Sequence, residues 1–196
     1  MFVRIHDLID RISSVRSFAV LSVLAVGLVL TVNLADFSWT LPGFRQLTHG
    51  VGILDMEAHY DADGAYRLLA AQGEAGRAHY LKSLWTLDVA IPLLVSLWLA
   101  TGIALAQRDR ATLWRAWLTL LPVAAGLSDL LENTGISILL MRYPQRLDTL
   151  AALTGDLTTL KHLLYVASLL AAAALGAGAW RRRVRCGGRR ESEHGS

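Results

Sequence analysis

Residues 113–141 read LWRAWLTLLPVAAGLSDLLENTGISILLM, a predominantly apolar stretch with two acids in its second half. About 20 such residues, wound into a helix, cross the roughly 30 Å hydrocarbon core of a bilayer. Asp129, Glu132 and Asn133 stand at positions i, i+3 and i+4, so they share one face of that helix. The stretch therefore predicts a membrane-spanning helix that carries one polar stripe.

Three further apolar blocks have the length of a membrane span, at about residues 17–35, 81–106 and 157–180. The 196-residue chain is 54% hydrophobic and only 18% charged, which excludes a disordered or nucleic-acid-binding protein. We therefore expect an all-α fold, a four-transmembrane-helix bundle in which residues 1–180 form a single membrane domain. Residues 181–196 form a basic tail that we expect to be disordered.

Two segments outside the spans are also predicted to be helical. The N-terminal apolar residues recur at helical spacing, which predicts a short amphipathic helix that lies in the membrane interface or binds a partner. Residues 36–80 are too many for an unstructured connection, so we expect a helical extracytoplasmic cap between the first two spans. Asp61 is placed to cap a helix from Ala62, Gly73 to end it, and Glu74 to open the next one.

The distribution of arginine predicts the orientation of the chain. Most Lys and Arg residues lie in the N-terminal arm, in the connection between the second and third spans and in the tail, which places both termini in the cytoplasm. The first block is longer than a signal-peptide core and ends in a poor cleavage site, so we interpret it as a retained anchor. The single cysteine, Cys186, has no partner for an intramolecular disulfide. The arginine-rich and alanine-rich composition is typical of a bacterium, and we expect the protein in the inner membrane.

Polar residues interrupt all four spans at a similar depth. A charged side chain in hydrocarbon costs on the order of 2.5–3.5 kcal/mol, so such residues normally face the bundle interior and pair. We therefore expect these residues to meet in one buried site in the outer half of the bilayer. The candidate catalytic residues are Asp88, Asp129, Glu132 and Lys161, and the candidate binding residues are Asn33, Asn133, His162 and Tyr165.

The charges of this predicted site do not balance. Asp88, Asp129 and Glu132 face Lys161 as the one certain cation, so at least one carboxylate is expected to be protonated or bound to a cation. Asp88, Glu132 and His162 would also suit a divalent metal, because hard cations prefer such ligands. No other cofactor is predicted.

A purely structural interpretation of the same residues stays open. Polar side chains inside membranes also hydrogen-bond helices together, at about 0.6 kcal/mol each. Pro92 kinks the second span and leaves the carbonyl of Asp88 without its helical donor. Such a kink would open room beside the carboxyl group of Asp88.

Several short motifs follow one another in a recognisable order. Asp129-x-x-Glu132-Asn133 is followed by Tyr143-Pro144 and by Thr158-x-x-Lys161, and the upstream part of the pattern is Asp55-Met56, Tyr60, Ala65-Tyr66, Gly73, Gly76-Arg77, Tyr80, Asp88 and Ile91-Pro92. Over about residues 50–165 this order resembles a family of small, uncharacterised bacterial four-span membrane proteins. The chain departs from the family pattern at His162, where a tryptophan is expected. The resemblance supports the fold and the site, and it implies no activity.

Three functions are compatible with such a site. An enzyme would use Asp129 or Glu132 as a general acid and Asp88 as a base on a lipid or isoprenoid-like small molecule, while Lys161 holds the ionised partner. A proton-coupled transporter of a small solute or ion would use the carboxylates as a relay and, with four spans, would need to be a homo-oligomer. A non-catalytic assembly subunit would bind its partner through the N-terminal helix and the tail. In each case we expect membrane lipids to be partners, and we expect no binding of nucleic acid.

Overall fold

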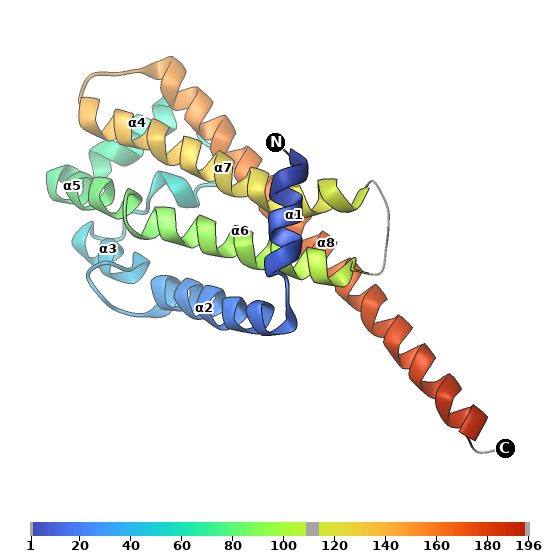
Figure 1. Cartoon of the computed structure of the whole chain (residues 1–196). Helices are drawn as coiled ribbons and strands as arrows, with labels where there is room; N and C mark the ends of the chain where they lie inside the picture. Colours follow the sequence, from blue (N-terminus) through green and yellow to red (C-terminus); the bar gives the residue numbers. More distant parts are fainter. Residues whose placement is uncertain (1, 109–113, 195–196) are drawn as a thin grey trace.

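The structure is a computed structural model that describes residues 2–108 and 114–194, and over that part of the chain it is helical without a β-strand (Figure 1). One short element, η1, is a single turn of 3-10 helix. In chain order the elements are α1 (Phe2–Ile12), α2 (Val15–Leu34), α3 (Leu41–Leu47), η1 (Leu54–Met56), α4 (Ala62–Ala71), α5 (Gly73–Leu84), α6 (Leu87–Ala106), α7 (Trp114–Arg142) and α8 (Asp148–His194).

Four helical segments of the described chain are long and apolar enough to cross a membrane, which confirms the predicted number of spans. The first and third, α2 and α7, agree with the predicted blocks within a few residues. The second span is divided, because a break at Trp85 and Thr86 separates α5 from α6 within the predicted block 81–106. α5 packs against α3 and α4, so it belongs to the cap as well as leading into the span.

α8 begins at Asp148, well before the predicted start at about residue 157. Its first turns pack against α4, and Ala151 within them is fully buried. The exposed side chains of Asp148 and Asp156 lower the local hydropathy, so the apolar pattern missed this part of the helix. α8 also continues to His194, through residues that we expected to lie outside regular structure.

α7 is the central helix of the bundle. It packs along α8 and along α6, and α2 packs against α6 at the edge of the bundle (Figure 1). The predicted N-terminal helix, α1, crosses α6 and α7 at a steep angle, and its Ile5 and Ile9 pack on Ala100, Ala104 and Val123. α2 and α8 expose most of their apolar surface, as helices that face lipid do.

The cap consists of α3, η1, α4 and α5, and its apolar core continues into the adjoining ends of α7 and α8. Asp61 caps α4 as predicted, since its carboxylate accepts a hydrogen bond from the backbone N–H of Gly64 at 2.7 Å. Gly73, with φ at 67°, makes the turn between α4 and α5. A Cβ at Gly155 of α8 would lie 2.0 Å from the carbonyl oxygen of Tyr60, so the glycine lets the cap backbone reach α8.

Pro92 ties α6 to α7. Because proline has no N–H, the carbonyl of Asp88 lacks its usual helical donor. The fully buried side-chain amide of Asn133 donates a hydrogen bond to that carbonyl at 2.7 Å. Asn133, which the sequence placed among the binding residues, is therefore a hydrogen-bonded clamp between two helices.

We expect Asn133→Ala to lower the free energy of unfolding by about 1–2 kcal/mol, because it leaves a buried carbonyl unpaired. The cost should be smaller in a Pro92→Ala background, since the restored N–H of residue 92 then bonds to the carbonyl of Asp88. Unfolding of the four proteins in mixed micelles gives the coupling between the two substitutions. Equal costs in both backgrounds would contradict the clamp.

Candidate functional site

The ammonium of Lys161 on α8 lies among three carboxylates. Its Nζ is 2.6 Å from Oε2 of Glu132 and 3.6 Å from Oδ1 of Asp129, both on the facing side of α7. It also forms an ion pair with Oδ1 of Asp55 in η1. We call these four residues the lysine cluster. It joins the two most extensively packed helices of the bundle to the cap.

Exposure differs among the three carboxylates of the lysine cluster. The side chain of Glu132 is fully buried, whereas those of Asp129 and Asp55 keep 12% and 16% of their surface accessible. Glu132 is therefore the inner member, closed to any ligand. Asp129 and Asp55 are the members that a second molecule can reach.

Hydrogen bonds fix the orientation of the two carboxylates on α7. The hydroxyl of Thr158 donates to Oε1 of Glu132 at 2.6 Å. The hydroxyl of Tyr165 donates a longer bond, 3.4 Å, to Oδ2 of Asp129. Thr158, Lys161 and Tyr165 lie on one face of α8, because they follow at intervals of three and four residues. The polar stripe that the sequence predicted on α7 therefore faces a matching polar stripe on α8.

Asp55 is the member of the cluster that sequence reasoning did not select. It stands in the cap among other acids, and its partner Lys161 follows 106 residues later. The backbone N–H of Asp55 donates a hydrogen bond to the hydroxyl of Tyr80 at 3.2 Å, and this bond helps to position η1. The sequence did contain one indication of this role, because Asp55 is the first residue in the series of motifs that also includes Asp129 and Lys161.

Asp88, predicted as a catalytic base, is not part of the cluster. Its carboxylate forms no ion pair with a described residue, and it lines a cavity of about 40 Å³ together with Thr40, His79 and Ser83. The sequence gives the depth of Asp88 in its span, but not the rotation of α6 about its own axis. Its backbone carbonyl accepts a hydrogen bond from the side chain of Asn133 on α7.

Two predicted binding residues also lie outside the cluster. Asn33 is exposed on α2, and its amide donates to the carbonyl of Val29 in its own helix at 2.9 Å. His162 is half-buried on α8 and makes no hydrogen bond or ion pair within the described chain. Among residues 2–108 and 114–194, the donors that lie close enough together for a metal are instead Asp55, Asp129 and Glu132, whose ligand atoms lie within 4.8 Å of one another. Because Lys161 already pairs with all three, a cation bound there would have to displace its ammonium.

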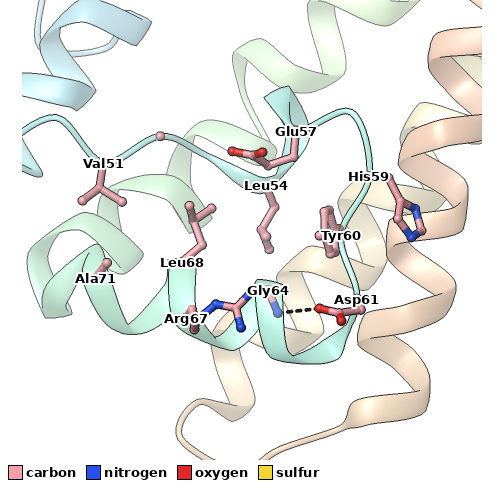
Figure 2. Close-up of a pocket in the computed structure, with 11 residues that line it drawn as sticks. Val51, Leu54, Glu57, His59, Tyr60, Asp61, Gly64, Arg67, Leu68 and Ala71 are labelled. Carbon is pink, nitrogen blue, oxygen red and sulfur yellow. Dashed lines mark hydrogen bonds between the residues drawn. The ribbon is translucent and has the colours of Figure 1, made fainter.

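A cavity of about 710 Å³ opens in the cap, and Figure 2 shows the residues around it. Its lining includes the charged side chains of Glu57, Asp61 and Arg67 and the imidazole of His59. Tyr60 lies in its wall, almost fully buried, and burial raises the pKa of this phenol well above its ordinary value. The phenol is therefore protonated at neutral pH. We call this space the cap cavity.

A second cavity, of about 430 Å³, lies between α2, α6 and α8. Among its lining residues only Asp129 of α7 and Tyr165 of α8 are polar. Val26, Leu30 and Leu169 in its wall are all more than 40% exposed, so the cavity opens sideways where α2 and α8 face lipid. We call it the membrane cavity.

The fold and the cluster define the class of protein. It is a helical chain with four segments that could span a membrane and a buried Asp/Glu/Lys cluster between two of them. Comparison with protein-family models, curated proteins and solved structures finds no match. The resemblance to a bacterial four-span family therefore stays a prediction, and function is argued from the geometry.

We expect Lys161→Met to destabilise the protein by about 3–5 kcal/mol, because it leaves buried carboxylates without a counter-charge. Combining it with Glu132→Gln should recover part of that loss, since one of the unpaired charges is then removed. Unfolding in mixed micelles measures both effects, and Lys82→Met, at an exposed lysine of α5, is the matched control. If the double variant is as unstable as the sum of the single variants, the ion pair is not what holds α7 to α8.

Proposed function

We propose that the protein is an inner-membrane enzyme that transfers a proton to or from a lipid-like molecule, with Asp129 as the acid–base group. One observation carries this proposal. Asp129 belongs to the lysine cluster and also lines the membrane cavity, so a single carboxyl group joins the buried charges to a space open to the bilayer.

The neighbours of Asp129 suit a group that gains and loses a proton. When Asp129 loses its proton, the ammonium of Lys161, 3.6 Å away, stabilises the carboxylate. Glu132 and Asp55 hold Lys161 in place by closer ion pairs, and they leave the third contact weaker. Tyr165 orients the second oxygen of Asp129. A substrate double bond in the membrane cavity would take the proton of Asp129 on one carbon, and the carboxylate so formed would remove a proton from a neighbouring carbon, which moves the double bond and restores the acid.

A hydrocarbon setting strengthens this chemistry. Charges act over longer distances where water is excluded, so a carboxylic acid next to one fixed ammonium is an effective proton donor and acceptor. The lining of the membrane cavity is otherwise apolar, and it excludes water from the reacting atoms.

The orientation follows the arginine pattern, with both termini in the cytoplasm and the cap on the opposite side. Cys186, the single cysteine, should then react with a membrane-impermeant maleimide only after the cells are opened. Glu74→Cys in a Cys186→Ser background, at an exposed cap position, should react in intact cells. Labelling of Cys186 in intact cells, with no labelling at position 74, would show that the topology is the reverse of the one predicted here. The cluster would then lie near the inner surface of the membrane.

We expect Asp129→Asn to reduce product formation by about a hundredfold or more, because the amide keeps the shape of the carboxyl group but exchanges no proton. The assay uses purified protein in D2O, in vesicles of a total bacterial lipid extract, and follows the incorporation of deuterium at lipid carbon by mass spectrometry over time. Asp63→Asn, at an exposed cap carboxylate paired with Arg146, is the control.

Three results would separate the candidate functions in those vesicles. Lipid turnover that Asp129→Asn abolishes supports the enzyme. A proton or ion flux without lipid turnover favours the carrier. If the wild-type protein alters no lipid and carries no flux, while the same protein co-purifies with a stoichiometric partner, the chain is an assembly subunit and our proposal fails.

A further inference from the structure

A further apolar cavity lies at the end of the bundle away from the cap (Figure 1). It has a volume of about 460 Å³ and is bordered by α2, α6 and α8. Its lining includes Val15, the first residue of α2, and Ala106, the last residue of α6. From there the lining runs toward the cap as far as Trp98 and Leu169. We call this space the distal cavity.

The walls of the distal cavity are apolar. Its lining residues are aliphatic, aromatic or glycine. Trp98 donates its indole N–H to Ser22 of α2 at 2.8 Å and stacks against Phe18 of the same helix, so its ring is fixed at the end nearer the cap. Four small residues of α8 leave the open space, namely Ala172, Ala173, Gly176 and Ala179. These walls suit a hydrocarbon chain and not a polar solute.

The dimensions of the distal cavity fit one lipid tail. Its lining covers residues 98–106 of α6 and 169–180 of α8. At 1.5 Å per residue, these stretches are about 12 and 17 Å long. One leaflet contributes about 15 Å of hydrocarbon, half of the bilayer core. A helix of another chain would not fit, because a helix about 10 Å across and of the same length fills roughly 1,300 Å³.

Arg182 of α8 stands at the mouth of the distal cavity. Its Nη2 atom is 3.5 Å from the carbonyl oxygen of Ala106, which lines the cavity. A Cβ added at Gly178 would lie 3.7 Å from its Nη1 atom, so the side chain follows the surface of α8. Arg182 is half-buried, and it forms no ion pair with another residue that the structure describes. Its positive charge is therefore available to an anion that enters the mouth.

Two further positive groups lie at the same mouth. The N-terminal end of a helix carries a partial positive charge, and α2 begins at Val15 in the cavity lining. Arg16, the next residue, is exposed. The carbonyl end of α6 also lies here, where Arg182 covers the carbonyl of Ala106. An apolar cavity with a cationic mouth fits a molecule that has a hydrocarbon tail and an anionic headgroup.

We propose that the distal cavity binds one tail of an anionic phospholipid whose phosphate contacts Arg182. In the orientation that the arginine pattern predicts, this lipid belongs to the cytoplasmic leaflet, where anionic lipids attract basic residues. The bound tail fills the space between α2 and α8 and so supports α2, which packs on α6 and α3. The proposal does not depend on the proposed function, because Asp129 does not line the distal cavity.

Two variants separate the tail from the headgroup. Gly176→Phe should fill the cavity, because Gly176 lines it and a Cβ added there meets no atom within 4 Å. Ala177→Phe is its control, since Ala177 is the next residue of α8, is exposed and does not line the cavity. Arg182→Gln removes the charge at the mouth. Arg181→Gln removes the same charge from the neighbouring exposed residue.

Binding is measured on purified full-length protein in detergent by titration and native mass spectrometry. The probes are dioleoyl phosphatidylglycerol, dioleoyl phosphatidylcholine and the short-chain dihexanoyl phosphatidylglycerol. We expect the wild-type protein to bind the dioleoyl phosphatidylglycerol at least about tenfold more tightly than the other two. Gly176→Phe should weaken that binding by about tenfold or more, and Arg182→Gln should remove the preference over phosphatidylcholine. Each control should change the affinity by less than about twofold.

Several results would overturn the proposal. It fails if phosphatidylcholine or the short-chain lipid binds as tightly as dioleoyl phosphatidylglycerol, or if Gly176→Phe leaves that binding unchanged. It also fails if Arg181→Gln acts as strongly as Arg182→Gln, because the effect then belongs to the basic surface as a whole. Asp129→Asn should bind the lipid as the wild-type protein does, so failure here leaves the proposed enzyme untouched, and failure of the enzyme leaves this site untouched.

Discussion

The pairing of one ammonium with three carboxylates is the constraint on which the rest of the structure depends. A buried charge is costly unless it is paired, and Lys161 is the counter-ion of Asp129, Glu132 and Asp55. These partners come from α7 and from η1, so the same contact holds the central helices together and seats the cap on them. Asn133 adds a second link, between α7 and α6, at the carbonyl that Pro92 leaves free. α7 is central because both links end on it.

Two spaces of different character lie close to the lysine cluster. The cap cavity is lined by several polar and charged side chains and by the buried phenol of Tyr60. The membrane cavity is apolar apart from Asp129 and Tyr165. Asp55 is the carboxylate that the cap contributes to the cluster, and Asp129 is the one that lines the membrane cavity. Of these two spaces, only the membrane cavity is therefore lined by a member of the cluster.

The sequence predicted the features that depend on local periodicity. Apolar blocks revealed four spans, Asp61 revealed the start of α4, and the spacing of Asp129 and Glu132 revealed a polar face on α7. Features that depend on helix rotation or on distant pairing were missed. Asp88 has the right depth but forms no ion pair with Lys161 and lines another cavity, Asn33 bonds to its own helix, and Asp55 pairs with a lysine 106 residues away. Hydrophobic pattern sets depth along a span, but it does not set which neighbour a side chain meets.

The order of the lysine cluster along the chain has a consequence for biosynthesis. Asp55, Asp129 and Glu132 all precede Lys161, which lies on the fourth span. Until that span has entered the bilayer, the nascent protein holds its acids in or near the lipid without the cation that neutralises them. Insertion of the fourth span therefore completes the charge balance of the lysine cluster. A chain that stops after the third span would keep unneutralised acids in the bilayer and would be a natural target for quality control.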